Sequence, residues 1–278
     1  MHILKGYTKQ EISWMMYDWA NSAHSVIIVT LLPIFFDTVA GYTADSVSSM
    51  STWGYATSIA MLIVALAAPF LGVFGDIRGM RKKLFSFFML LGVAACAGMA
   101  FTPGMDFTSG PMAAGKVATL ILVLYIVSVI GFDASAIYYD AFLTDVTIED
   151  RMDKVSTMGY GLGYIGGSTI PLLIFLIMNL VGVPMLTCLA FVFGLTAVWW
   201  LAFSLPLLKN CEQTSGKPYE KGDVARSIKG VGTTIKEIIA NKPMLIYILS
   251  YFFYIDGVHT VISMATTYGT NLGLSLIH

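Results

Sequence analysis

The sequence predicts an all-α polytopic membrane protein, and three observations lead to that fold class. Hydrophobic residues make up 56% of the 278 residues and charged residues only 12%, whereas a soluble domain carries about 25% charged residues. Seven apolar stretches are each long enough to cross the roughly 30 Å hydrocarbon core of a bilayer. Fifteen of the 16 Lys and Arg residues fall in alternate connections between these stretches, as expected when those connections share one side of a membrane.

The first stretch follows Lys5 and Lys9, but it is too long for the apolar core of a signal peptide and is interpreted as a retained span. Lys116 alone lies on the side opposite to the other basic residues, which places the N-terminus in the cytoplasm. We therefore expect a multi-pass protein of the cell (cytoplasmic) membrane, with the lipid bilayer as a partner. The predicted spans are 12–37, 53–75, 84–102, 117–139, 157–180, 184–206 and 244–266.

Composition also excludes several classes of function. A formal net charge of −1 argues against nucleic-acid binding, which needs a basic face. Cys96, Cys188 and Cys211 form no CxxC pair and have no histidine at zinc-binding spacing, so we interpret them as packing residues. We expect no metal and no cofactor.

Three regions are predicted along the chain: a six-helix bundle over 1–206, a linker over 207–243, and a seventh helix with an outer tail over 244–278. The linker opens polar and flexible between Lys209 and Gly222 and then becomes amphipathic. That amphipathic helix suits either the cytoplasmic leaflet or the side of the bundle. Its apolar positions are Val224, Ile228, Val231, Ile235 and Ile238.

Ionisable residues occur at membrane depth only on the first, fourth and seventh spans. Such residues are costly in lipid and usually face an aqueous path, and an interval of three helices is typical of transporters built from three-helix repeats. We predict that they belong to a substrate or proton pathway. They are Asp18 and His24, then Asp133, then Asp256 and His259.

The first and seventh spans share the pattern D-x-x-[NH]-[ST]-x-x-S, which places four polar residues in one stripe of each helix. The match indicates duplicated halves, with coincidence as the alternative. His24 lies off the stripe, and for it a local structural role and a functional role stay equally open. The two sets are Asp18, Asn21, Ser22, Ser25 and Asp256, His259, Thr260, Ser263.

Glycines are concentrated in the fifth span. Gly159, Gly163 and Gly167 form a small-xxx-small ridge that allows a second helix to approach closely. Gly161 to Gly166 reads GxGxxG, but no strand precedes it, so a dinucleotide site is rejected.

Several segments resemble a known family. The loop Gly72-Val-Phe-Gly-Asp76-Ile-Arg78-Gly79-Met-Arg81-Lys82-Lys83 resembles the signature loop of the major facilitator superfamily, with Ile77 where a basic residue is usual. Three further segments resemble its vacuole-effluxer-like branch, namely Tyr17-Asp-Trp-Ala-Asn-Ser22, Gly159-Tyr-Gly-Leu-Gly-Tyr-Ile-Gly-Gly167 and Tyr254-Ile-Asp-Gly-Val258.

The resemblance implies a twelve-helix carrier with two bundles that works by alternating access and exports a small molecule, with amino-acid efflux as the associated activity. It also implies a cytoplasmic conformational latch formed by Gly72, Asp76, Gly79, Arg81 and Lys82. The chain reaches only the seventh helix of that plan, so we expect it to be a fragment or a truncated product. The remaining helices of the second bundle are expected to be needed for activity.

Three functions are weighed from the sequence. The leading one is a secondary transporter for a small polar solute, coupled to protons through Asp18, Asp133 or Asp256. The second is a non-transporting membrane scaffold or sensor derived from a carrier. The third is an intramembrane enzyme that uses a buried Asp pair, or Asp with His, as acid and base, but the sequence contains no GxSxG or HExxH motif.

Overall fold

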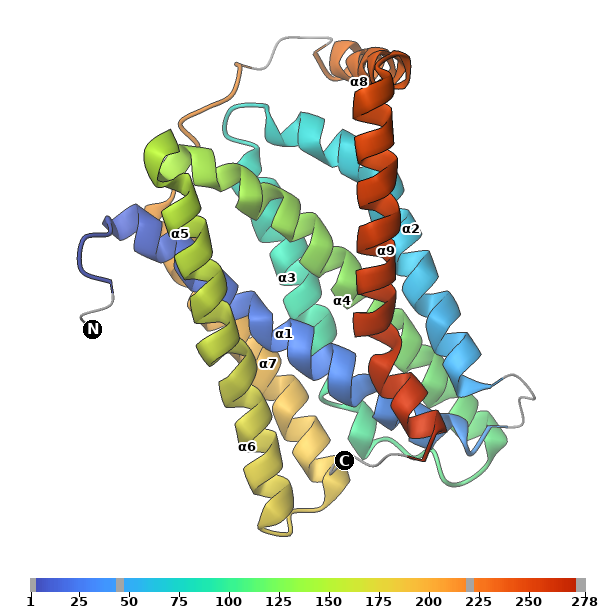
Figure 1. Cartoon of the computed structure of the whole chain (residues 1–278). Coiled ribbons are helices and arrows are strands. Elements are labelled where there is room, and N and C mark those ends of the chain that lie inside the picture. The colour runs from blue at the N-terminus through green and yellow to red at the C-terminus, as the bar shows by residue number, and fades with distance from the viewer. Residues whose placement is uncertain (1–3, 44–47, 219–222, 274–278) are drawn as a thin grey trace.

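The computed structural model describes residues 4–43, 48–218 and 223–273, with backbone only for 223–228, 270 and 271. Within these residues the protein is all-α, and it is a polytopic membrane protein (Figure 1). The helices are α1 (Lys9–Ala40), α2 (Ser49–Gly75), α3 (Arg81–Met99), η1 (Thr102–Gly104), α4 (Pro111–Val146), α5 (Glu149–Leu162), η2 (Gly163–Ser168), α6 (Thr169–Leu180), α7 (Met185–Asn210), α8 (Asp223–Ala240) and α9 (Lys242–Asn271).

The described residues form seven spans that are long and apolar enough to cross a membrane, as predicted, and most extend beyond their predicted bounds. α1 begins at Lys9 because Thr8 and Glu11 cap it reciprocally, each side chain accepting a hydrogen bond from the other's backbone N–H. α4 continues seven residues past the predicted end at 139, and Phe142 and Val146 in this extension are buried. The span from 149 to 180 is continuous through η2, a turn of wider π-helix.

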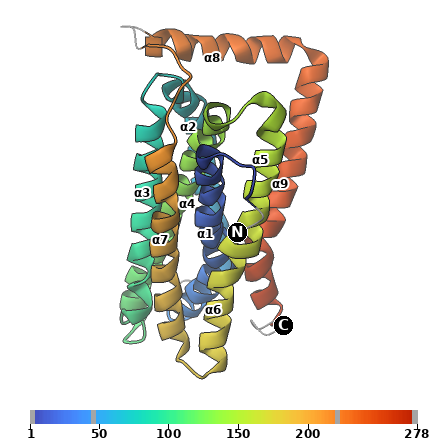
Figure 2. The ribbon, with the colours of Figure 1, turned by 90° about the vertical axis from the view of Figure 1, so that its left-hand side faces the viewer.

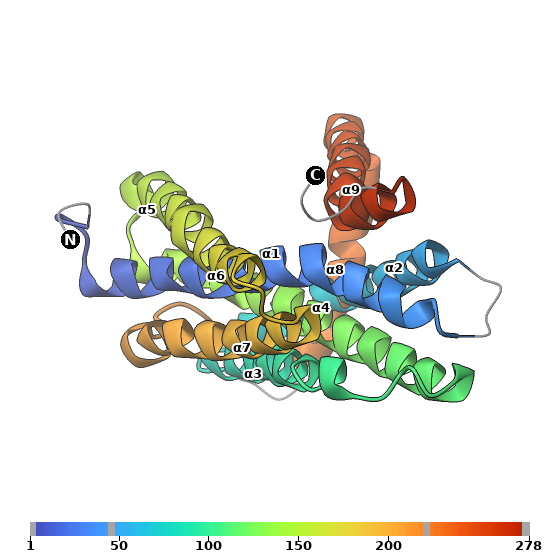
Figure 3. The same cartoon turned by 90° about the horizontal axis from the view of Figure 1, so that it is seen from below.

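α1 runs through the middle of the structure and contacts α2, α4, α5, η2, α6, α7 and α9. Figure 3 shows α3 and α7 on one side of α1 and α9 on the other. The largest fully buried side chains include Tyr17, Trp53, Phe85 and Trp200, which come from α1, α2, α3 and α7. Tyr138 and Phe142 of α4 belong to the same set, so the core is shared among these four helices and α4, with α1 at its centre.

α8 lies crosswise to α9 at one end of the bundle and contacts α9 and α2 (Figure 2). Its apolar side chains Ile235 and Ile239 are exposed, 50% and 59% respectively. The amphipathic pattern allows α8 to lie on the cytoplasmic leaflet or against the bundle. These two isoleucines are not buried against the bundle.

α9 joins the bundle through its second half. Met264 packs against the core and lies 3.7 Å from the position that a Cβ on Gly54 of α2 would occupy. Residues of the first half, such as Tyr247 and Phe253, are exposed. The contact with α1 and α2 is therefore made at the end of α9 that is remote from α8.

Candidate transport pathway and conformational latch

The polar stripe of α1 lies directly against the glycine ridge of α5 and η2. A Cβ added to Gly159 would lie 2.6 Å from Asp18 Oδ2, and one added to Gly163 would lie 2.6 Å from Ser22 Oγ. A Cβ on Gly167 would lie 2.4 Å from the backbone oxygen of Trp19. The structure therefore brings two of the sequence-predicted site segments together, and the glycines allow that close approach.

Hydrogen bonds and an indole ring reinforce this contact. Ser168 donates to the backbone oxygen of Ser22 (3.3 Å). Gly166 lies under the indole of Trp19, where a Cβ would come within 1.9 Å of the ring. Trp19 in turn stacks on Trp199 of α7, with ring centroids 5.9 Å apart. One turn of α1 is thus fixed between α7 and the π segment.

A second set of polar contacts joins α1 to α4. Trp14 Nε1 donates to the backbone oxygen of Tyr139 (2.9 Å), and the hydroxyl groups of Tyr17 and Ser135 lie 2.8 Å apart. His24 Nε2 lies 3.2 Å from Ser128 Oγ in a fully packed environment. The structure therefore gives His24 a local partner, as in the structural alternative, and does not place it beside Asp18.

Asp18, Asp133 and Asp140 have no basic partner in the described part of the chain. Asp18 and Asp133 are half-buried and Asp140 is exposed, and none of the three ion pairs formed by the described residues includes them. Asp133 Oδ2 is buried without a hydrogen-bond partner. These carboxylates are available to a proton or to another cation.

The structure does not bring the seventh span's ionisable residues to those of α1 and α4. Asp256 and His259 are exposed, and no hydrogen bond or ion pair between described residues involves their side chains. Thr260 and Ser263, from the same stripe, line a 430 Å³ hollow together with Gly54 of α2. The α9 stripe therefore meets α2 through its hydroxyl residues alone.

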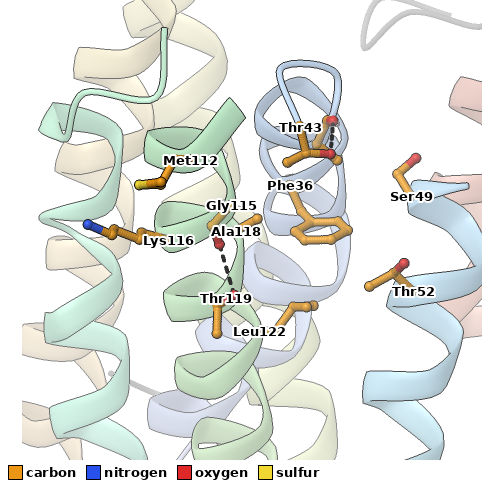
Figure 4. Close-up of a pocket in the computed structure, with 11 residues that line it drawn as sticks. Phe36, Thr43, Ser49, Thr52, Met112, Gly115, Lys116, Ala118, Thr119 and Leu122 are labelled. Carbon is orange, nitrogen blue, oxygen red and sulfur yellow. Dashed lines mark hydrogen bonds between the residues drawn. The ribbon is translucent and has the colours of Figure 1, made fainter. Parts of the chain in front are cut away.

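A separate hollow of 610 Å³ opens at the end of the bundle opposite to α8, between α1, α2 and α4 (Figure 4). Phe36, Thr52, Lys116 and Thr119 are among its lining residues. None of the lining residues is acidic, so this hollow is distinct from the region of the aspartates.

The latch residues cluster at the α2–α3 connection, where Arg81 pairs with Asp76 and with a second acidic residue. Arg81 is buried at 4% exposure and forms its main ion pair with Asp145 at the end of α4. Arg81 Nη2 lies 3.9 Å from Asp76 Oδ1, and the Asp76 side chain is 84% exposed. Lys82 forms no ion pair within the described part of the chain. The expected Asp76–Arg81 pair is therefore present, and Arg81 also forms a closer pair with Asp145 that the sequence did not predict.

The two latch glycines have different settings. Gly79 has φ +80°, a left-handed conformation that favours glycine, and its N–H donates to Gln213 Oε1 (2.8 Å). A Cβ on Gly72 would meet no atom within 4 Å, so close packing does not require glycine there.

The first part of the linker, residues 211–217, docks over this connection, and we name it the linker strap. Gln213 Nε2 donates to the backbone oxygen of Gly75 (3.0 Å). Asp145 Oδ1 accepts from the backbone N–H groups of Thr214 (3.0 Å) and Ser215 (2.9 Å). The sequence predicts a flexible segment over 209–222. The structure instead ties residues 211–217 to α2, α3 and α4, while 219–222 lie outside the described residues.

Sequence reasoning missed Asp145 and Gln213, and it also missed a buried pair at the start of α1. Glu11 accepts two hydrogen bonds of 2.8 Å from Arg151 and one of 2.7 Å from Thr147. The T-x-x-E spacing of Thr8 and Glu11 was a readable capping signal. The pairing with residues about 140 positions later leaves no local signal.

Comparison with known proteins identifies the family of this chain. The family model described as vacuole effluxer Atg22 like matches residues 7–146 and 144–276. An uncharacterised MFS-type transporter, YxiO of Bacillus subtilis (strain 168), is 40% identical over 280 residues, which cover 98% of this chain and 63% of that protein. The autophagy-related proteins 22-1 of Penicillium rubens and Sclerotinia sclerotiorum are 26% and 27% identical over 45% and 40% of this chain, covering 23% and 21% of their own lengths.

The chain thus spans less than two thirds of the length of these relatives. The matched family segments nevertheless run from before α1 into α9 and include the α1 stripe, the latch loop and the glycine ridge. The chain belongs to the vacuole effluxer Atg22-like family of the major facilitator superfamily.

Proposed function

We propose that this chain forms the first part of a secondary transporter that moves a small polar solute by alternating access, with amino-acid efflux as the expected activity. The name of the Bacillus subtilis relative and the description of the family model support a transporter rather than an enzyme. The observation that carries the proposal is the presence of Asp18 and Asp133 at membrane depth on α1 and α4, half-buried and without a basic partner among the described residues. We place the protein in the cell membrane with its N-terminus in the cytoplasm, because the basic residues gather at the α8 end.

In this proposal the solute and proton pathway follows Asp18, Asn21 and Ser22 on α1, Asp133 on α4, and the stripe of α9. Charged carboxylates are costly at this depth. Each is therefore suited to take up a proton when the pathway closes to water and to release it when the pathway opens. Proton binding and solute movement would be coupled in this way.

The two-bundle arrangement supplies the moving parts. Residues 1–206 act as one bundle, 207–243 as the linker, and 244–278 as the start of the second bundle. α9 contacts α1 and α2 through its second half, so the described part of the second bundle meets the first at the end remote from α8. Rocking about that contact would open and close the α8 end, where the latch and the linker strap lie.

Counterflow of radiolabelled amino acids in vesicles that contain the full-length protein tests the proposal. We expect Asp18→Asn and Asp256→Asn to abolish coupled counterflow, while Asp153→Asn, an exposed carboxylate on α5, leaves it unchanged. Wild-type protein that exchanges no solute would favour the scaffold or sensor alternative. Both variants transporting at the wild-type rate, with unchanged pH dependence, would show that the aspartates are structural.

A further inference from the structure

α8 lies at the level where the spans leave the membrane. The span formed by α9 begins at Lys242, and α8 ends at Ala240, so only Asn241 separates the two helices. Figure 2 shows α8 crosswise to the spans at one end of the bundle. A helix in this position runs parallel to the membrane surface, at the depth of the lipid headgroups.

The corner between α8 and α9 is short and hydrogen-bonded. The backbone N–H of Asn241 donates to the backbone oxygens of Glu237 (3.0 Å) and Ile238 (3.1 Å) at the end of α8. The side-chain oxygen of Asn241 accepts from the backbone N–H of Met244 (3.3 Å) in the first turn of α9. The position of α8 is therefore tied to the position of the α9 span.

Two isoleucines of α8 point away from the side that faces the bundle. Val231 and Ile238 are half-buried, which identifies the side of α8 that contacts α2 and α9. Ile235 and Ile239 are exposed. They are displaced from Ile238 by about 60° and about 100° around the helix axis, in the same direction. They form an apolar edge, the isoleucine edge, that the described part of the chain leaves open.

Lysines border the isoleucine edge on the side away from the bundle. Lys236 follows Ile239 by about 60° around the helix axis, and Lys229 lies about 20° further in the same direction. Both lysines are exposed, and neither forms an ion pair with another described residue. Glu237 lies about 160° from both isoleucines, on the other side of the helix. Apolar side chains followed by basic ones match the order of acyl chains and phosphate groups in a leaflet of anionic lipid.

Further helices of the second bundle are the other possible cover for this edge. An apolar helix packed there would bury the isoleucines, but it would also bring Lys229 and Lys236 out of water without a counter-charge. Burial of an unpaired charge is costly. Lipid phosphates supply the counter-charge, so the charge pattern of α8 favours lipid over a second layer of helices.

We propose that the exposed edge of α8 is a docking surface for anionic phospholipids of the leaflet at this end of the bundle, which is the cytoplasmic leaflet in the proposed orientation. The isoleucines insert between acyl chains, and the lysines bind phosphate groups. Because Asn241 joins α8 to α9, the bound leaflet holds the start of α9 at a fixed depth. The residues of the surface are Lys229, Ile235, Lys236 and Ile239.

Fluorescence quenching tests the surface in the full-length protein, reconstituted in vesicles of equal parts phosphatidylglycerol and phosphatidylcholine. A bimane label is attached to Ile239→Cys in one sample and to Thr233→Cys, about 120° away around the axis, in another. We expect a nitroxide near the start of the lipid acyl chain to quench the label at position 239. Iodide in the water should instead quench the label at 233.

Three results would overturn the surface. Quenching of the label at 239 by iodide alone would mean that this edge of α8 faces water. Quenching of that label by neither agent would mean that protein covers it. Equal quenching of the labels at 239 and 233 by the lipid nitroxide would mean that α8 has no lipid-facing edge.

The dependence on lipid charge tests the lysines. With the label at Ile239→Cys, phosphatidylglycerol that carries the nitroxide should be enriched near the label about 3- to 10-fold over phosphatidylcholine that carries it. The double variant Lys229→Gln and Lys236→Gln should bring this ratio close to 1, and high salt should lower it. Lys154→Gln, which removes an exposed lysine on α5, is the matched control and should keep the ratio. Equal quenching by the two lipids without any lysine substitution would refute the preference for anionic lipid.

The failure of this surface can be distinguished from the failure of the transport function, because the quenching measures position and needs no transported solute. Vesicles that exchange solute while lipid does not reach the label at 239 would retain the carrier and remove the surface. Lipid quenching at 239 with the expected charge dependence, in protein that exchanges no solute, would retain the surface and remove the carrier.

Discussion

Arg81 at the start of α3 and Asp145 at the end of α4, 64 residues apart, form a buried ion pair that also anchors the linker strap. Arg81 Nη1 donates to Ser215 Oγ (3.1 Å), and Asp145 accepts from the backbone of the same segment. One pair thus joins two helix ends and the start of the linker. Asp76, the acidic residue of the latch loop, is left exposed beside it.

Asp145→Asn should release the linker strap. The variant removes the charge that holds Arg81 and weakens two hydrogen bonds from backbone N–H groups, and hydrogen bonds to charged groups contribute about 1.5–3 kcal/mol each. We expect the amides of Thr214 and Ser215 to exchange hydrogen roughly 10- to 100-fold faster, measured by mass spectrometry on the protein in detergent.

Cleavage by a Glu-specific protease after Glu212, an exposed residue at the start of the strap, should accelerate in the same variant. Asp153→Asn is the control because Asp153 is exposed and forms no ion pair in the described part of the chain. Unchanged exchange and unchanged cleavage in Asp145→Asn would mean that the strap is held mainly by Gln213.

Gly167→Ala should destabilise the protein, whereas Gly161→Ala should not. A Cβ at Gly167 would lie 2.4 Å from the backbone oxygen of Trp19, which cannot rotate away, while a Cβ at Gly161 meets no atom within 4 Å. Overpacking of this kind costs about 1–3 kcal/mol, and for a chain of this size 1 kcal/mol corresponds to about 2–4 °C. Thermal unfolding of both variants in detergent measures the difference, and equal unfolding temperatures would contradict the contact between α1 and the ridge.

The thiol of Cys211 should react slowly with maleimide. We expect the reaction rate to keep rising with pH up to at least pH 10, without levelling off. Cys211 is fully buried after the end of α7, and burial raises its pKa to about 12. The reactive thiolate is therefore a small fraction at neutral pH, and its concentration rises about tenfold per pH unit up to that pKa. Rates of modification between pH 7 and 10 check this expectation.

A cysteine introduced at Glu212 is the comparison, since that neighbouring side chain is exposed and its thiol should level off near the ordinary value of about 8.5. A plateau near pH 9 for Cys211 itself would show that the thiol is open to water. The native cysteines are all buried, so their slow reaction also permits labelling of introduced cysteines.

Labelling from either side of intact cells should place Thr108 outside and Glu212 inside. Both side chains are exposed and lie in connections at opposite ends of the bundle. Cysteines at these positions should react with an impermeant thiol reagent only from the stated side. Reaction of Glu212→Cys from outside would reverse the orientation derived from the basic residues.

The existence of the spans was predictable because each depends on the composition of about 20 consecutive residues. Their ends were not, since the last turns of α4 are stabilised by burial of Phe142 and Val146 against other helices. The glycine ridge was visible in the sequence, but its partner was not, because any helix with a suitable face could occupy it. Which aspartate lies closest to Arg81 likewise depends on how α3 and α4 pack. From the charges in the sequence alone, Asp76, Asp140 and Asp145 were all possible partners.

The π-helical turn η2 (Gly163–Ser168) divides the fifth span into two helices, α5 and α6, whose side chains follow different angular positions around the common axis. A wide turn contains one residue more than an α-helical turn, so everything after it is rotated by about 100° about the helix axis. The ridge that meets α1 is therefore not continued by the same face of α6, which packs against α7. One uninterrupted span therefore presents two differently oriented faces to its neighbours. Deletion of a single residue within this turn would restore a regular α-helical turn and keep the orientation of the side chains from Thr169 to Leu180, whereas conversion of the turn to α-helix at unchanged length would rotate all of them by about 100°.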